Sequence, residues 1–128
     1  MGLSDCRLEA ALAVSDLERA RRYYEEGLGL VPGEQEEGVS ARYPCAGETT
    51  LLVYLSPGNA GKSTATMVTW FVDDLDGTMD ELGSRGVAFE HYDQPGLSTD
   101  ERGVFAREGL RAAWFRDPDG NTLEVAEV

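Results

Sequence analysis

The chain carries one internal repeat, and this repeat restricts the folds open to it more than any other feature. Residues 13–17 (AVSDL) are matched by residues 71–75 (FVDDL), and each copy joins a strand-like run to a helix-like run through a capping residue. Short runs broken by Gly and Pro follow both copies. The repeat predicts two β-α-β-β-β modules, module one at residues 7–55 and module two at 64–128, joined by a Gly-, Pro- and Ser-rich linker at 56–63.

The two modules are expected to form one α+β domain. The chain has 128 residues, which is the length of a single domain, so 1–128 is taken as one unit of fold. Each half alone is too small to cover its own sheet, and the halves should therefore pack together as a curved mixed sheet. A ligand site would most naturally lie in the cleft between them.

Within module one, Leu8 to Val14 reads as a strand because its apolar side chains alternate along the chain. Ser15 or Asp16 then caps a helix that ends near Gly27. Three further strands are expected, at residues 30–35, 38–43 and 49–55.

Module two follows the same plan. Thr66 to Val72 reads as a strand, and Asp73 or Asp74 caps a helix that ends near Gly86. The loop from Asp93 to Gly103 looks able to fold over a cleft. Further strands are expected at residues 87–92, 103–107 and 111–116.

The last 17 residues, 112–128, read as a β-hairpin. Pro118 presets φ for the turn and Gly120 supplies a positive φ. In the second arm Leu123 and Val125 flank Glu124, so a carboxylate lies on the face opposite the apolar one. A carboxylate in that position suggests a function.

The charge of the chain restricts its partners. Eleven Lys and Arg residues against 24 Asp and Glu give a formal charge of -13, which repels phosphate backbones and anionic membranes. We expect neither nucleic acid nor a membrane as partner. With no apolar run long enough to span a bilayer and no secretory signal pattern, the sequence favours a cytoplasmic protein.

Three segments carry a resemblance to a known family: residues 14–24 (VSDLERARRYY), 28–30 (LGL) and 115–124 (FRDPDGNTLE). In this order they resemble the vicinal oxygen chelate superfamily, which includes glyoxalase I, extradiol dioxygenases, and fosfomycin- and bleomycin-resistance proteins. The resemblance covers essentially the whole chain. It implies paired β-α-β-β-β modules around a cleft, usually in a homodimer, but it names no reaction.

Metal-using members of that family hold a divalent ion with one side chain from each of four strands. The resemblance places those four positions at Glu9, Leu52, Met67 and Glu124. Leucine offers no ligand, and a thioether suits neither hard nor borderline ions, so no metal or other cofactor is expected. If a divalent metal does bind, Glu9 and Glu124 would hold it, with a shifted register or a ligand from Tyr54 or His91 as the alternatives.

Strand alternation predicts which side chains line the cleft. Glu9, Glu124 and Thr122 fall on one sheet face, whereas Trp70 and Trp114 read as core packing and Arg116 as a solvated charge. The expected ligand contacts are Ala11, Leu52, Tyr54, Met67, Thr69 and Phe71.

Three residues are the candidate catalytic groups. Glu9 and Glu124, if close together in an apolar cleft, would repel each other and raise at least one pKa, as a general acid or base requires. His91, the one histidine of the chain, adjoins the loop at 93–103 and could carry protons if that loop closes. Exposure of both glutamates on a shallow sheet surface stays an equal alternative.

Three functional classes remain open. The first is a bleomycin-resistance-like protein that binds a small cationic or aromatic molecule in the cleft without the full metal site. The second is an enzyme, either a metal-dependent lyase or dioxygenase of the glyoxalase type or a metal-free isomerase or lyase using Glu9 and Glu124. The third is an accessory or regulatory domain that associates with other proteins.

Overall fold

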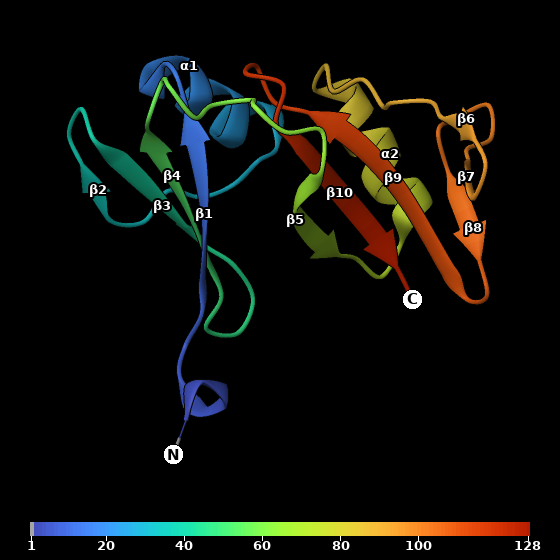
Figure 1. Ribbon diagram of the computed structural model, residues 1–128, viewed down its shortest axis with the longest axis horizontal. Coiled ribbons are helices and arrows are strands. Elements are labelled where there is room, and N and C mark those ends of the chain that lie inside the picture. Colours follow the sequence, from blue (N-terminus) through green and yellow to red (C-terminus); the bar gives the residue numbers. More distant parts are fainter. Residues whose placement is uncertain (1) are drawn as a thin grey trace. The chain divides into compact units, whose positions relative to one another are not determined.

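The computed structural model describes residues 2–128 (Figure 1). The chain divides into two compact units, one ending at Ala60 and the other beginning at Gly61, so the division falls inside the expected linker. Each unit has its own four-stranded sheet and its own helix, in agreement with the α+β fold of two repeated modules.

The sheet of module one has the strand order β1-β4-β3-β2. Strand β1 runs parallel to β4, and β4 is antiparallel to β3. The buried side chains Leu12, Val14, Tyr43, Leu51 and Val53 point to the helix side and form the core. The strands span Glu9–Val14 (β1), Gln35–Glu36 (β2), Ser40–Pro44 (β3) and Thr50–Leu55 (β4), after a short 3₁₀ turn at Leu3–Asp5.

The helix of module one, α1 (Leu17–Arg22), begins at Asp16, whose side chain accepts a hydrogen bond from the amide of Arg19 at 3.0 Å. This bond satisfies one of the amides that the first turn leaves without a partner. The helix continues as a π-helical turn, η2 (Tyr23–Gly27), and buries Tyr24 against Tyr43, with ring centroids 6.1 Å apart. Asp16 rather than Ser15 is therefore the capping residue.

Module two repeats this arrangement, with the strand order β5-β10-β9-β8. Strand β5 is parallel to β10, and β10 is antiparallel to β9. Asp74 caps the helix by accepting from the amide of Gly77, and Glu127 accepts from the amide of Leu75 at 2.8 Å. The elements span Thr66–Phe71 (β5), Leu75–Ser84 (α2), Asp93–Gln94 (β6), Leu97–Ser98 (β7), Phe105–Arg107 (β8), Leu110–Arg116 (β9) and Thr122–Glu127 (β10).

The turn between β9 and β10 confirms the predicted hairpin. Gly120 has φ of 90°, and the buried Asp117 accepts from the amides of Asp119 and Asn121 at 3.0 and 2.9 Å. The side-chain amide of Asn121 returns a third bond to Asp117 at 2.8 Å. Because buried polar groups are costly unless they are bonded, this closed network explains the residue types of the turn.

The linker is attached to this turn. The amide of Gly61 donates to the side-chain oxygen of Asn121 at 3.1 Å. Gly61 has φ of +64°, and a Cβ built on it would collide with the carbonyl oxygen of Asp119. The end of the linker is thus a fitted segment of module two.

Two of the expected strands are wrong. Residues 30–35 do not form a strand, and β2 covers only Gln35–Glu36; Pro32, within the expected run, has no amide hydrogen to pair. Residues 87–92 contain only an isolated bridge from Phe89 to Phe115, and the amide of Glu90 donates to Trp114. The short β6–β7 hairpin follows instead.

Candidate functional site

Each sheet has one face against its helix and one face that the helix leaves uncovered (Figure 1). On the uncovered face of module two, Glu124 pairs in register with Thr69 on β5 and Trp114 on β9. The hydroxyl of Thr69 donates to Glu124 Oε1 at 2.8 Å, and the glutamate is half-buried. Thr69, which was expected to contact a ligand, therefore holds the carboxylate of Glu124, one of the three candidate catalytic groups.

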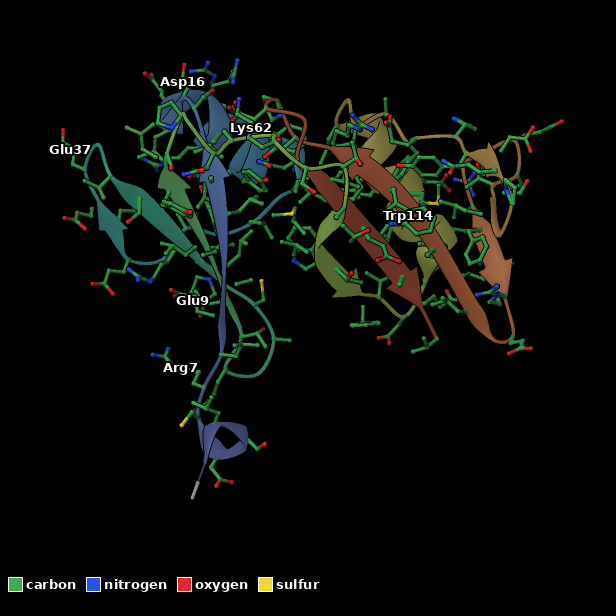
Figure 2. The ribbon with its side chains drawn as sticks, in the orientation of Figure 1. Arg7, Glu9, Asp16, Glu37, Lys62 and Trp114 are labelled. Atoms are coloured by element: carbon green, nitrogen blue, oxygen red, sulfur yellow. The ribbon has the colours of Figure 1, made fainter. Side chains whose placement is uncertain are left out.

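Glu9, which Figure 2 labels at the start of β1, belongs to an ion pair. Its carboxylate accepts from Arg42 Nε at 2.8 Å and from Arg42 Nη2 at 3.4 Å. The hydrogen bond from Arg42 lowers the pKa of Glu9, against the smaller opposing effect of desolvation. This works against a general-acid role for Glu9. Its predicted approach to Glu124 stays a prediction, because the two residues lie in different units.

Ala11, Leu52 and Arg42 lie side by side across strands β1, β4 and β3, with Leu52 in the middle. Tyr54, two residues beyond Leu52, shares its sheet face and is half-buried. Three of the expected contact residues of module one therefore occupy one surface.

These residues fit the family's metal poorly. Leu52 carries no donor atom, Met67 offers only a thioether, and the carboxylate of Glu9 is already bonded to Arg42. Among residues 2–128 there is no group of three or more His, Cys, Asp and Glu side chains placed to hold a metal ion.

A β-bulge changes the expected face of β5. Thr122 pairs with Thr66 but Leu123 pairs with Val68, so Met67 is the extra residue. The bulge brings Thr66, which strict alternation would put on the other face, within 3.1 Å of the Trp114 indole nitrogen, which donates to it. Met67 and Phe71 are both exposed.

A cavity of about 350 Å³ opens on this side of module two. Trp114 forms one wall (Figure 2), and the ring of Tyr92 meets it edge-on, with centroids 5.7 Å apart and planes at 77°. Trp114 is therefore a half-exposed pocket residue and not the core residue that its pattern suggests. The cavity is lined by Thr64, Thr66, Tyr92, Gln94, Leu97, Trp114, Arg116 and Thr122.

Sequence reasoning placed Thr122 on this face but gave it no role. Its side chain is 2% exposed, and its hydroxyl oxygen is buried without a hydrogen-bond partner among the described residues. Arg116 is exposed and forms a 2.8 Å ion pair with Glu90, as expected for a solvated charge that balances a nearby acid, and it also lines the cavity. These contacts join residues far apart in the sequence, and no local pattern indicates them.

The loop at 93–103 forms part of the cavity wall through Gln94 and Leu97 of the β6–β7 hairpin. Its far end is tied to α2, because Arg102 pairs with Asp76 at 3.0 Å and with Asp80 at 2.6 Å. The loop thus lies beside a cavity of module two, and its closure over a ligand stays a prediction.

His91 is not among the residues that line this cavity. Its Nε2 lies 2.9 Å from the carbonyl oxygen of Glu101, and because a carbonyl can only accept, Nε2 carries the proton in this contact. The neighbouring residues Glu90 and Tyr92 instead contact Arg116 and Trp114. A catalytic role for His91 stays a prediction.

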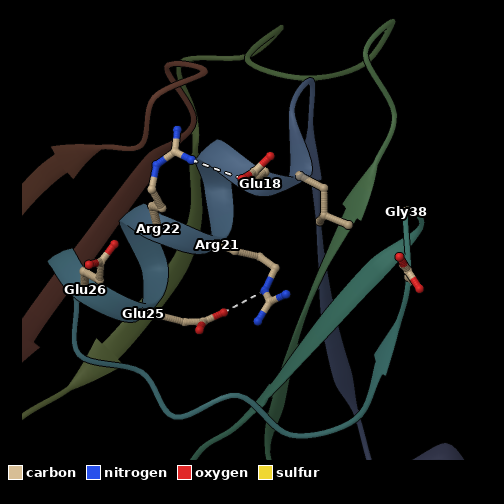
Figure 3. Close-up of a pocket in the computed structure, with 8 residues that line it drawn as sticks. Glu18, Arg21, Arg22, Glu25, Glu26 and Gly38 are labelled. Carbon is tan, nitrogen blue, oxygen red and sulfur yellow. Dashed lines mark hydrogen bonds and ion pairs between the residues drawn. The ribbon is translucent and has the colours of Figure 1, made fainter.

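A second cavity, of about 500 Å³, lies in module one between α1, η2 and the turn after β2 (Figure 3). Four of its charged side chains form two ion pairs: Arg21 with Glu25 at 2.8 Å and Arg22 with Glu18 at 3.7 Å. Tyr43 also donates to Glu25, at 2.9 Å. Burial raises the pKa of Tyr43, and its bond to Glu25 raises it further. This cavity lies on the helix side of the sheet.

The model of the Glyoxalase/Bleomycin resistance protein/Dioxygenase superfamily matches residues 8–125. The chain belongs to this superfamily. The repeated modules and the hairpin turn that carried the resemblance are thus features of a glyoxalase-superfamily protein.

Solved structures share the superfamily fold. A glyoxalase/bleomycin resistance protein from Catenulispora acidiphila is 27% identical, covers 97% of this chain and 99% of its own, and superposes with a TM-score of 0.71. An antibiotic-binding protein from a Streptomyces species is 24% identical (96% and 95% covered, TM-score 0.70). A lactoylglutathione lyase from Agrobacterium tumefaciens is 22% identical (96% and 93% covered, TM-score 0.64).

 

No curated protein matches the chain closely enough to count as a relative. At 24% identity and below, the antibiotic-binding protein and the lyase show the fold alone. Since a binder and an enzyme share that fold, the function of this superfamily member has to be argued from its own side chains.

Among residues 2–128, no helix is both long and apolar enough to cross a membrane.

Proposed function

We propose that this superfamily member binds a small cationic or aromatic molecule and works without the family's metal. The observation that carries the proposal is the ion pair between Glu9 and Arg42, with contacts of 2.8 and 3.4 Å. A metal at the first ligand position would have to displace Arg42, and Leu52 and Met67 could not replace the lost ligand. Two carboxylates without imidazole make a weak site.

Glu124 is the proposed anchor for a cationic group. The Thr69 hydroxyl holds one of its oxygens at 2.8 Å, on a sheet face that α2 does not cover. A carboxylate fixed in this way loses little conformational freedom when a ligand binds. In this proposal Thr69, Met67 and Phe71 contribute contacts from module two, on the same strand β5.

The test is a thermal-shift screen of cationic, neutral and anionic aromatic molecules, followed by calorimetry of the hits with two variants. Glu124→Gln removes the proposed anchor charge. Glu127→Gln is the matched control, because Glu127 lies three residues along the same strand but caps α2. Cationic hits should bind the Glu124 variant about tenfold more weakly, as expected for a lost charged hydrogen bond, and should bind the Glu127 variant as they bind the wild type.

Two results would contradict the proposal. One is that no molecule in the screen raises the melting temperature. The other is an equal loss of affinity in both variants, which would trace the effect to stability and not to an anchor.

A further inference from the structure

The hydroxyl of Thr122 is the unexplained polar group of module two. Thr69 and Thr66, on the neighbouring strand, both use their hydroxyls, the first as a donor to Glu124 and the second as an acceptor from Trp114. Thr122 is 2% exposed and lines the 350 Å³ cavity, yet its Oγ1 has no partner among the described residues. A buried hydroxyl without a partner is costly, and a ligand in the cavity could supply that partner.

The aromatic walls indicate what shape of ligand fits. Trp114 and Tyr92 stand nearly perpendicular, with centroids 5.7 Å apart, and Leu97 adds an apolar surface from the β6–β7 hairpin. A flat ring stacked on one wall would present its edge to the other, and both arrangements are favourable for aromatic pairs. The geometry therefore favours a planar ligand.

The charges of the lining indicate the ligand's charge. Among the described residues, no Asp or Glu lines this cavity, and the one charged residue that does, Arg116, is already paired with Glu90 at 2.8 Å. A cationic ligand would find no carboxylate there, and desolvating its charge would be costly. An uncharged ligand avoids that cost.

We propose that the module-two cavity binds an uncharged, planar molecule of one or two fused aromatic rings whose oxygen substituent hydrogen-bonds to Thr122. A volume of about 350 Å³ is at the lower end of the range for small-molecule pockets, which suits a ligand of this size. A phenolic hydroxyl and a ring carbonyl share this chemistry, because the threonine hydroxyl both donates and accepts. The inference goes beyond the proposed function, since it assigns an uncharged ligand to a cavity whose lining does not include Glu124.

The experiment titrates the protein with 2-naphthol, and with naphthalene as the control that lacks the oxygen. The indole N–H signals of the two tryptophans report the location. Trp114 lines the cavity, whereas Trp70 stacks on Phe115, with centroids 6.4 Å apart, and is the internal control. Wild type should bind 2-naphthol about five- to tenfold more tightly than naphthalene, the value of one net hydrogen bond, with a shift at Trp114 and none at Trp70.

Thr122→Val keeps the shape of the side chain and removes the hydroxyl. This variant should bind both molecules equally, and its Tm should rise by about 3–5 °C because the fold no longer buries a polar group without a partner. Thr49→Val is the matched control: its hydroxyl donates to the carbonyl oxygen of Ala46 in module one and it does not line the cavity, so 2-naphthol should retain its advantage there.

The proposal is overturned if 2-naphthol does not bind, if Thr122→Val leaves its advantage over naphthalene unchanged, or if Thr122→Val lowers the Tm. The last result would mean that the hydroxyl is already satisfied in the free protein. If 2-naphthol fails to bind at Thr122, the proposed function can still hold, because the cationic molecules found in the thermal-shift screen would still bind in a way that depends on Glu124.

Discussion

Glu9 and Glu124 are both glutamates, but each is hydrogen-bonded to a different kind of side chain. Glu9 and Glu124 look equivalent in the sequence, but the structure gives Glu9 an arginine and Glu124 a threonine as partner. The sequence separation of the Glu9–Arg42 pair is 33 residues, so no local pattern predicts it. At the residue scale, one carboxylate is held by a cation, and the other is bonded to a neutral hydroxyl.

This assignment makes a prediction about Glu9. The bond from Arg42 lowers its pKa below the ordinary value of 4.5, so the ion pair contributes stability above that value and loses it as the pH falls through the folded-state pKa. Carboxyl-detected NMR titration of wild type should therefore show Glu9 titrating below 4.5. In the Arg42→Met variant the pKa of Glu9 should rise back toward its ordinary value of 4.5.

A wild-type Glu9 that titrates at its ordinary value or above it would contradict the pairing. It would also restore Glu9 as a ligand or general acid. Arg107→Met is the control, because Arg107 lies in module two and contacts the ring of Phe105. It should leave the titration of Glu9 unchanged.

At the scale of elements, the hairpin turn and the linker act together. Asp117 and Asn121 form the buried network of the turn, and Asn121 also accepts from the amide of Gly61. The turn was predictable from Pro118 and Gly120, because turn chemistry is local. Its second role as the anchor of the linker was not predictable, since that contact joins positions 60 residues apart.

Gly61→Ala tests this anchoring. The substitution forces a positive φ on alanine and drives its Cβ into the carbonyl of Asp119, so we expect a loss of roughly 2 kcal/mol in the free energy of unfolding. Gly58→Ala is the matched control in the same linker, because its Cβ would meet nothing within 4 Å. Urea denaturation should show a large loss for the first and almost none for the second; equal values would refute the anchoring.

At the scale of the whole molecule, the internal repeat predicted two modules with equivalent sheets, and the structure confirms them. Strands β4 and β10 hold the same central position, each between a parallel and an antiparallel neighbour. The bulge at Met67 and the β6–β7 hairpin were missed because they depend on pairing across the sheet and not on alternation along a strand.

Those two misses affect the candidate site directly. The bulge brings Thr66 to Trp114, and the hairpin supplies Gln94 and Leu97 to the cavity wall.

The homodimer implied by the family stays a prediction, and light scattering of the purified protein would test it.

The central claim is that this superfamily member binds its ligand without the family's metal. Elemental analysis after incubation with Zn, Ni, Mn or Fe, on wild type and Glu124→Ala, tests it most directly. We predict that both proteins retain far less than one metal per chain after desalting, because Glu9 is paired with Arg42 and Leu52 offers no ligand. Near-stoichiometric metal in wild type that Glu124→Ala removes would contradict the account.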